Sequence, residues 1–226
     1  MGDTSKRPVK VTLLANTPHP DDVCDMAAAT CVSMEVPKGA SDGHRSLRAA
    51  LRSGHLSVCE HASFTFMIEN VTRVTTHQLV RHRMASYEQQ SQRYVAIDNI
   101  KYLQPDTVTE ASAEDEDLQK MLKVWRGSTQ MLSEMLRAKG VPEEDIRYIY
   151  PGGTVSNIMV TMNGRELLHF LALRRCSRAQ WEIRYIADRM AALAQEVAPV
   201  MFERCGPTCE QTGRCPEARS CGRLKG

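Results

Sequence analysis

The segment SFTFMIENV, residues 63–71, constrains the fold more than any other stretch of this chain. Its large apolar residues Phe64, Phe66 and Ile68 alternate with Thr65 and Glu69. Successive side chains of a β-strand point to opposite faces of a sheet, so this alternation predicts a strand with one buried face. The chain is therefore expected to contain a β-sheet.

Weaker patterns complete the expected set of elements. Runs of branched or apolar residues predict further strands at 9–15, 93–96 and 154–162. Helical spacing and capping signals predict helices at 20–31, 44–54, 72–84, 113–139, 164–173 and 180–198, with a short helix after Pro142. Asn163 and Glu166 have the spacing of a capping box at the start of one of these helices. Strands and helices interleave, so the expected fold class is α/β (α+β).

Length and charge limit the classes of protein to which this chain can belong. Its 226 residues allow one sizeable core, or one core with an appendage. We expect a single domain over residues 1–203 and a Cys-rich tail over residues 204–226. With 29 Lys and Arg against 27 Asp and Glu, the net charge is only +2. A duplex-binding domain would carry a larger basic excess, so no nucleic-acid partner is expected.

Neither export nor membrane insertion is expected. The most apolar long stretch, residues 186–200, is interrupted by charged residues and indicates an amphipathic helix. The first residues contain no apolar run of signal-peptide length. We therefore expect a cytoplasmic protein without a membrane partner, whose scattered cysteines are reduced thiols.

The segment RHRMASYEQQSQRY, residues 81–94, is the strongest candidate for a ligand site. The chain has no Gly-rich dinucleotide fingerprint and no P-loop motif, so a nucleotide would have to be held by side chains. Arg81, Arg83 and Arg93 suit a phosphate or diphosphate, because a guanidinium matches phosphate oxygens in bidentate fashion. Ser91 has no adjacent base and is expected to donate a hydrogen bond to a ligand phosphate. The amides that could read a base edge or ribose hydroxyls are Gln78, Gln89, Gln90 and Gln92. A solvated helix end is the alternative.

Two further clusters are less specific. Residues 171–184 group four arginines around Trp181, and a helix junction with salt bridges explains that cluster equally well. Residues 54–64 place His55, Ser57, Glu60 and His61 just before the clearest strand, where a structural role is the alternative.

Together these segments resemble the flavin-dependent thymidylate synthases. Arg81-His82-Arg83, seven residues and then Ser91 match the RHR-x7-S signature of that family, and the match extends to Tyr94. The other family landmarks correspond here to His55, Glu60-His61, the FTF run at 64–66, Gln78, Asn163-Gly164-Arg165 and residues 173–184. The resemblance spans about residues 9–203.

The resemblance implies a function and an architecture. Members of the family convert dUMP to dTMP, taking the methylene group from 5,10-methylenetetrahydrofolate and a hydride from FADH2, which NADPH regenerates. Their family-specific α/β fold has an antiparallel or mixed sheet with flanking helices. They are homotetramers whose active sites use residues of several subunits, and FAD lies at a subunit junction on side chains.

The resemblance also implies roles for individual residues. The expected FAD-binding residues are Ser57, Arg81, His82, Arg83, Gln89, Asn163, Arg165 and His169. The expected dUMP-binding residues are Gln78, Arg81, Gln89, Ser91, Gln92, Arg93, Arg174 and, from another subunit, Arg147. The residues expected on the flavin or folate side are His55, Glu60 and Tyr94. Arg174 and Ser91 are the expected catalytic residues. For Arg174 the reason is that a fixed cation at the uracil ring favours the N3-deprotonated form of the ring.

Two positions depart from the common pattern of the family. Gln89 stands where Glu is frequent, and His169 stands where Asn is frequent. Both side chains can still form hydrogen bonds, so these departures do not change the expected activity.

The tail has a separate pattern. Cys205, Cys209, Cys215 and Cys221 follow the spacing C-x3-C-x5-C-x5-C, and four thiolates are the number that a structural zinc ion needs. The pattern lacks a C-x2-C pair, and free thiols are the alternative.

Two rival functions are a nucleic-acid-binding module and a family member that has lost activity and serves as a structural or flavin-storage protein. The near-neutral charge and the low aromatic content argue against the first. The joint presence of Ser91, Arg93, Arg147 and Arg174 argues against the second. The sequence does not decide between NADPH and NADH as the reductant.

Overall fold

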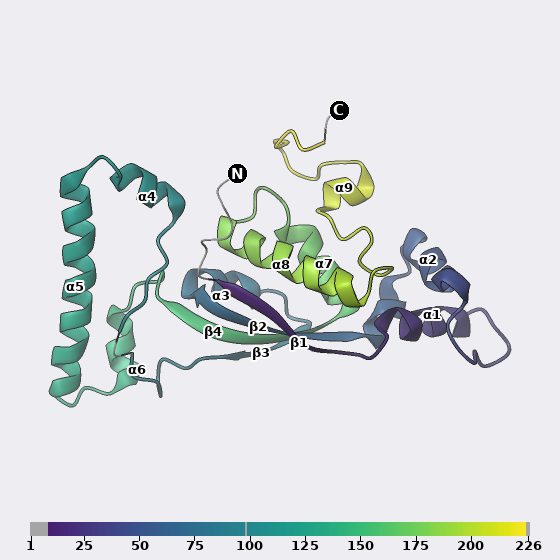
Figure 1. The fold of residues 1–226 in the computed structure, drawn as a ribbon, viewed down its shortest axis with the longest axis horizontal. Coiled ribbons are helices and arrows are strands. Elements are labelled where there is room, and N and C mark those ends of the chain that lie inside the picture. The colour runs from purple at the N-terminus through teal and green to yellow at the C-terminus, as the bar shows by residue number, and fades with distance from the viewer. Residues whose placement is uncertain (1–8, 98, 225–226) are drawn as a thin grey trace.

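The computed structural model describes residues 9–97 and 99–224, and its centre is a four-stranded sheet (Figure 1). The strand order is β1 (Lys10–Asn16), β2 (Ser63–Thr72), β4 (Val155–Asn163) and β3 (Ala85–Gln89). All three pairings are antiparallel. The strand predicted at 63–71 is confirmed as β2, and its Phe64, Phe66 and Ile68 are fully buried.

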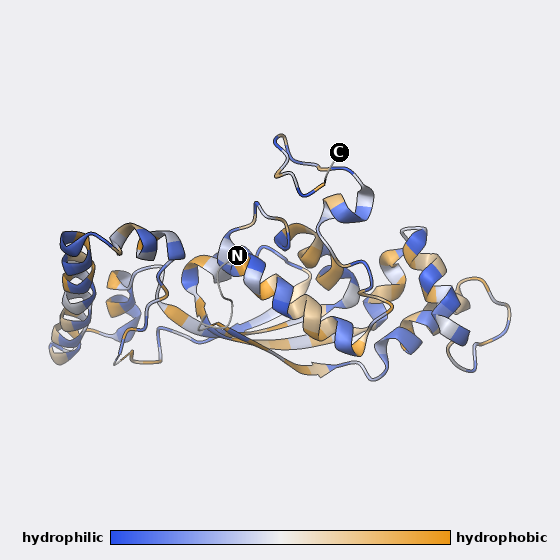
Figure 2. Cartoon of the chain, turned by 45° about the horizontal axis from the view of Figure 1, so that its top comes forward, coloured by the Kyte–Doolittle hydropathy of each residue, from blue (hydrophilic) through white to orange (hydrophobic). Residues whose placement is uncertain are grey.

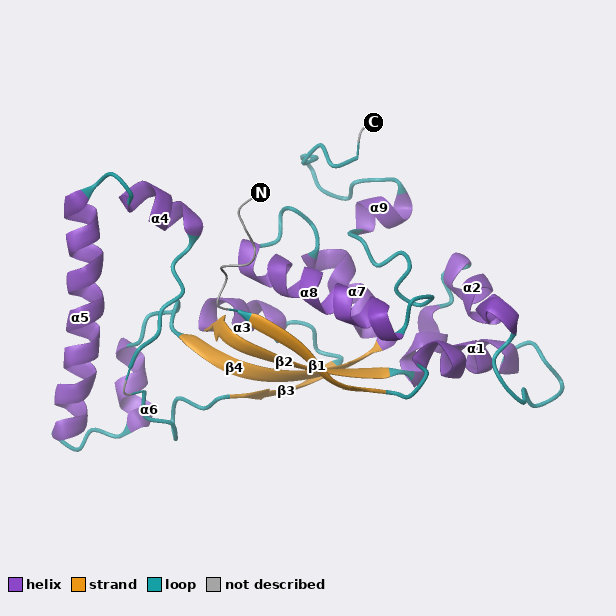
Figure 3. Cartoon of the chain, in the orientation of Figure 1, coloured by secondary structure: helices purple, strands orange, loops and turns teal. Residues whose placement is uncertain are grey.

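Helices cover one face of this sheet. Figure 3 shows α7 (Gly164–Arg174) and α8 (Trp181–Val197) lying across it, with α3 (Arg73–Leu79) on the same side. The core lies between these helices and the sheet, and there Phe64 meets Phe202 edge to face at 5.3 Å. The opposite face, on which Thr65 and Met67 are only half-buried, has no helix of the described residues against it (Figure 3). One face of the sheet is therefore left for solvent or another chain.

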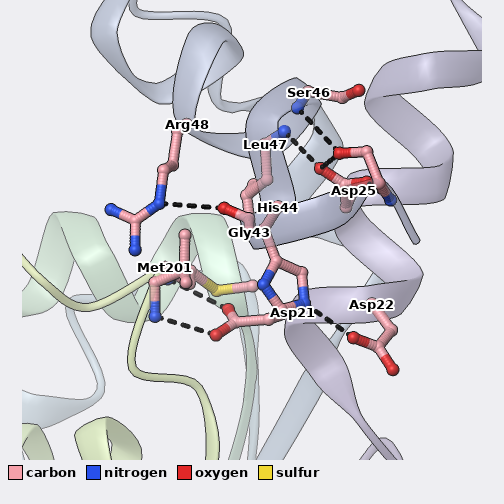
Figure 4. A network of polar contacts seen from close by, with 11 residues as sticks. Asp21, Asp22, Asp25, Gly43, His44, Ser46, Leu47, Arg48 and Met201 are labelled. Atoms are coloured by element: carbon pink, nitrogen blue, oxygen red, sulfur yellow. Dashed lines mark hydrogen bonds and ion pairs between the residues drawn. The ribbon is translucent and has the colours of Figure 1, made fainter.

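Two buried aspartates hold the helices at one end of the sheet (Figure 4). Asp25 of α1 (Pro20–Thr30) accepts hydrogen bonds from the backbone N–H of Leu47, in α2 (Arg45–Arg52), at 2.8 Å and from that of Ser41 at 2.6 Å. Burial opposes ionisation of Asp25, but these hydrogen bonds outweigh it and lower the pKa of its carboxyl group. Asp21 accepts from the N–H groups of Val200 and Met201 at 2.8 and 3.0 Å, which fixes the chain after α8 against α1.

The opposite end of the molecule carries the helices inserted between β3 and β4 (Figure 1). These are α4 (Asp106–Ser112), α5 (Glu116–Ala138) and α6 (Glu143–Ile146), followed by the 3-10 turn η4 (Arg147–Ile149). The helix predicted at 113–139 is confirmed with a later start, because the Asp115 carboxylate caps it by accepting from the Leu118 N–H at 2.8 Å. Figure 2 shows that α5 mixes hydrophilic and hydrophobic residues and stands away from the sheet.

Most other predicted elements agree with the structure to within two residues, including the end of α8 before Pro199. The capping box is confirmed on its N-cap side, since Asn163 Oδ1 accepts from the Glu166 N–H at 2.9 Å. Two predictions are wrong. The helix expected at 72–84 ends at Leu79, and residues 93–96 do not form a strand. The strand lies instead at 85–89, where it pairs with residues 158–162 of β4.

The remaining chain follows α8. It includes the short helix α9 (Thr208–Thr212), which lies above α7 in Figure 1. None of the helices in the described part of the chain is long and apolar enough to span a membrane. Residues 1–8, on which part of the expectation about export depends, lie outside the described residues.

Candidate active site

The centre of the site is His82, which lies in the turn between α3 and β3 and is buried. Arg174, the last residue of α7, donates from Nε to His82 Nε2 at 3.0 Å. His82 Nδ1 lies 3.2 Å from a carboxylate oxygen of Glu166, which is also on α7. A guanidinium can only donate, so Nε2 must be the acceptor and Nδ1 must carry the proton that Glu166 accepts. The three side chains thus form one chain of hydrogen bonds.

Charge favours this arrangement. Burial, with the nearby charges of Arg174 and His169, lowers the pKa of His82 to about 4. Burial also raises the pKa of Glu166, although His169 opposes that shift. His82 is therefore neutral at neutral pH, and Arg174 stays a cation because guanidinium does not lose its proton in proteins. The result is a fixed positive charge held at its Nε by a neutral acceptor.

Packing sets the position of the His82 ring and of Arg174. The ring meets Phe170 edge to face at 4.9 Å, and the ring of His169 lies 5.8 Å away. Arg174 also donates to the backbone carbonyl of Gln78 at 3.4 Å. The end of α3 and the end of α7 are therefore joined at Arg174.

Two cations stand beside His82 without a partner among the described residues. Arg81 and Arg83 are exposed and line an open cavity of about 650 Å³ together with His77 and Val80. Among residues 9–97 and 99–224, neither guanidinium has an ion pair or a side-chain hydrogen bond. Unpaired guanidinium groups at a cavity suit an anion such as a phosphate. This donor set fits the diphosphate of a flavin dinucleotide.

A second group of predicted residues lies at the other end of β3. Ser91 and Gln92 line a cavity of about 250 Å³, and the buried side-chain nitrogen of Gln92 has no hydrogen-bond partner in the described part of the chain. The Ser91 hydroxyl accepts from the Arg93 N–H at 3.1 Å. The Arg93 guanidinium pairs with Glu144 at 2.9 Å and lies over the Tyr94 ring at 5.4 Å. A buried, unpartnered amide at a polar cavity indicates a place for a ligand.

Arg147 and Gln89 are the predicted residues nearest to this second group. Arg147 donates from Nε to the backbone carbonyl of Glu144 at 3.1 Å, so it comes close to Arg93 within one chain. Gln89 donates from its amide to the hydroxyl groups of Thr76 and Ser156 at 3.2 and 3.0 Å. Its amide nitrogen is therefore used inside the chain, and only its oxygen remains available.

β3 separates the two groups. The strand runs from Ala85 to Gln89, with Arg83 before it and Gln90 after it. Five residues of a strand span about 17 Å at 3.3 Å each. The predicted dUMP residues Gln78, Arg81 and Arg174 thus lie at one end of β3, and Ser91, Gln92 and Arg93 lie at the other. In the described part of the chain, Arg81 lines one cavity and Ser91 and Gln92 line another.

The other predicted residues lie near the start of α7. Arg165 pairs with Glu60 at 2.5 Å, which links α7 to the 3-10 helix η3 (Leu56–His61). Asn163 uses its side-chain oxygen to cap α7, and His169 is exposed on that helix. His55 and Ser57 are exposed at the start of η3. No hydrogen bond or ion pair joins those two side chains to Arg81 or Arg83 within the described residues.

Sequence reasoning missed Glu166 as part of the site. The sequence marked it only as the acidic residue three positions after the N-cap in a capping box, whose side chain would turn back to the helix start. In the structure its carboxylate points to His82 instead. The sequence did offer a signal for Glu166 as a site residue: it lies three positions before His169 on the helix that ends in Arg174.

Comparison with known proteins identifies the family. A family model described as "Thymidylate synthase complementing protein" matches residues 12–200. The flavin-dependent thymidylate synthase of Geobacter sulfurreducens is 42% identical, over 95% of this chain and 94% of that protein. The protein of the same name from Clostridium tetani is 40% identical with the same coverage. A UMP/dUMP methylase, PolB from Streptomyces cacaoi bound with 5-Br dUMP, has a similar fold, with a TM-score of 0.71 over 88% of this chain and 94% of that one at 23% identity. The chain belongs to the flavin-dependent thymidylate synthase family.

Proposed function

We propose that the protein is a flavin-dependent thymidylate synthase that converts dUMP to dTMP. The observation that carries this proposal is the Arg174 cation, held by neutral His82 beside the unpaired Arg81 and Arg83. Membership of the family and the dUMP analogue bound by the structural relative support it. The methylene group comes from 5,10-methylenetetrahydrofolate. Reduced FAD supplies the hydride when it is bound, and NADPH is the source of its electrons.

Arg174 would act on the nucleotide ring. A fixed cation next to the N3–H of uracil lowers the pKa of that group and stabilises the deprotonated ring. The anionic ring is more nucleophilic at C5, where the new carbon–carbon bond forms, so no protein nucleophile has to attack C6. Ser91, Gln92 and Arg93 would hold the nucleotide, with Gln92 providing a buried amide nitrogen that has no partner among residues 9–97 and 99–224.

Arg81 and Arg83 would hold the diphosphate of FAD, with Arg165, Ser57 and His169 as further contacts. Both ring nitrogens of His82 are used within the chain, so we propose that His82 serves FAD binding through its place between the two arginines. His55, Glu60 and Tyr94 remain candidates for the flavin or folate side.

A complete site would need a second copy of the chain. The two groups of nucleotide-binding residues stand at opposite ends of β3, so a copy that presents its Ser91 end to the Arg174 end of another would complete one site. The chain has apolar surface to spare for this contact. Met121, Val124, Met131 and Met135 of α5 are each at least 59% exposed. We propose a homotetramer in which residues 1–203 form the catalytic domain and residues 204–226 form an appended tail.

Replacement of Arg174 tests the proposal. Arg174→Ala should keep bound flavin, because Arg81 and Arg83 remain, and should lose dTMP formation. Arg189→Ala, an exposed arginine on α8, is the matched control and should retain activity. Turnover of Arg174→Ala near that of the control would contradict the proposed role.

A visible spectrum separates a working enzyme from an inactive relative that only stores flavin. The purified protein is examined before and after anaerobic NADPH, with and without dUMP. An oxidised-flavin spectrum that NADPH bleaches, faster with dUMP present, supports the proposal. A protein that takes up FAD but forms no dTMP from dUMP and methylenetetrahydrofolate would favour storage.

A further inference from the structure

The Cys-rich tail is bound to the segment that joins α7 and α8. Thr208 donates to the carbonyl of Ala172 in α7 at 3.4 Å. Arg178 in the connecting segment donates to the carbonyl of Arg219, and Arg223 donates back to the carbonyl of Arg175 at 3.0 Å. Contacts from both directions hold the tail in place over this segment (Figure 1).

Four cysteines face one cavity between these two parts. The cavity has a volume of about 50 Å³. The cysteines that line it are Cys176, from the connecting segment, and Cys209, Cys215 and Cys221, from the tail. Cys209 is buried, Cys176 and Cys215 are half-buried, and Cys221 is exposed. A space of this size holds one ion or one or two water molecules.

Cys205 does not belong to this group, although the sequence pattern grouped it with the tail cysteines. It is 1% exposed and packs in the main core. Arg175 donates from Nη1 to its sulfur at 3.4 Å and to its carbonyl oxygen at 3.0 Å. The structure therefore replaces Cys205 in the expected set of four by Cys176, which lies 33 positions before Cys209.

We propose that Cys176, Cys209, Cys215 and Cys221 bind one zinc ion. Four thiolates in tetrahedral geometry are the usual shell of a structural zinc site, and each thiol releases its proton to water on binding. The site then carries a net charge of −2. Arg178 and Arg223 line the same cavity and offset part of that charge, although each already pairs with a carboxylate, Arg178 with Glu217 at 3.9 Å and Arg223 with Glu210 at 2.5 Å.

Binding requires the sulfur atoms to move together. Among the described residues, no three candidate ligands already stand close enough to share an ion. The tail has turns that permit this movement: Gly213 and Gly222 adopt positive φ angles of 70° and 79°, one before Cys215 and one after Cys221. The ion would then fix the segment that joins α7 and α8, which begins directly after Arg174. This zinc site does not depend on the proposed reaction.

Metal analysis of the full-length protein tests the site. The protein is purified under reducing conditions without chelator, loaded with zinc, passed through a desalting column and measured by mass spectrometry for zinc per chain. We expect one zinc ion per chain, and loss of that ion in Cys176→Ser and Cys209→Ser. Cys205→Ala and Cys31→Ser, an exposed cysteine on a distant helix end, should keep it.

Cobalt gives a second measurement that does not depend on the variants folding. Cobalt bound by four thiolates in the wild-type protein gives intense visible bands of tetrahedral geometry and a sulfur-to-metal charge-transfer band in the near ultraviolet. Several results would overturn the proposal. These are no metal above trace after loading, zinc retained by Cys176→Ser but lost by Cys205→Ala, iron with inorganic sulfide in place of zinc, or disulfides among the four cysteines in the reduced preparation.

Discussion

Replacing Glu166 tests whether the hydrogen-bond chain through His82 positions Arg174. Glu166 accepts the proton of His82 Nδ1, which leaves Nε2 free to accept from Arg174. In Glu166→Ala the buried Nδ1–H has no acceptor. The imidazole then either keeps an unsatisfied donor or moves its proton to Nε2, where it opposes the N–H of Arg174. Both outcomes disturb the orientation of the guanidinium.

The size of the effect follows from the cost of a buried donor without a partner. That cost is about 1–3 kcal/mol. A loss of about 2 kcal/mol in the transition state lowers kcat/KM about 30-fold. Glu166→Gln keeps an oxygen acceptor and loses only the charge, which is worth about 1 kcal/mol or about 5-fold. The alanine variant should therefore be clearly worse than the glutamine variant.

The assay measures turnover and the tautomer of His82, because a purely structural role of Glu166 would not change both in parallel. Formation of dTMP is measured for both variants, with flavin content and melting temperature as checks on folding. Nitrogen-15 spectra of histidine-labelled protein report the tautomer of His82. We expect a protonated Nδ1 in the wild type and in Glu166→Gln, and a changed signal in Glu166→Ala.

Two results would refute this reasoning. One is an alanine variant that binds flavin and turns over within about twofold of the wild type. The other is an equal loss in both variants, which would mean that the negative charge of Glu166 matters and its hydrogen bond to His82 does not.

Three further predictions concern stability. The pKa of His82 is about 4 in the folded chain and about 6.5 in the unfolded chain, so the unfolded state binds the proton at higher pH than the folded state does. The free energy of unfolding should therefore fall by about 3 kcal/mol as the pH drops from 6.5 to 4. Urea unfolding at several pH values should show a weaker dependence of this free energy on pH in His82→Gln than in the wild type. Asp25→Ala leaves the buried N–H of Leu47 without its acceptor and should cost about 3 kcal/mol in denaturant unfolding, whereas a cost below about 1 kcal/mol would contradict the role of Asp25 in holding α2 against α1. A Cβ on Gly164 would lie 2.7 Å from the carbonyl oxygen of Cys59, so Gly164→Ala should lose about 1–3 kcal/mol, and an unchanged melting temperature would show that η3 can move away.

Local signals were enough to predict most elements. The alternation in β2, the Asn163 cap of α7 and the acidic start of α5 each depend on residues within a few positions of one another. Patterns of this kind act through backbone geometry and neighbouring hydrogen bonds, so they can be read without knowledge of the fold.

The sequence did not predict β3, because residues 85–89 form a strand only through pairing with β4. Residues 93–96 include Tyr94 and Val95, which favour strands, but no strand of the described residues pairs with them, whereas residues 85–89 include Ser86, Glu88 and Gln89 and still form a strand. They do so because they pair with β4, more than 65 positions later in the chain. Tyr87 adds hydrogen bonds from its hydroxyl to the carbonyls of Leu79 and His82, which closes the turn after α3. Pairing with a distant strand outweighs local β propensity.

The sequence by itself determined the family, through the order and spacing of its motifs, and it identified the cationic residues of the candidate site. Only the tertiary structure decided how those residues are used. Arg174 meets His82 across 92 positions and His82 meets Glu166 across 84, because α7 packs on the sheet beside the end of α3. The same packing places Cys176 against the tail and leaves Cys205 in the core. Contacts at such separations depend on how complete elements pack, and no local pattern in the sequence encodes them.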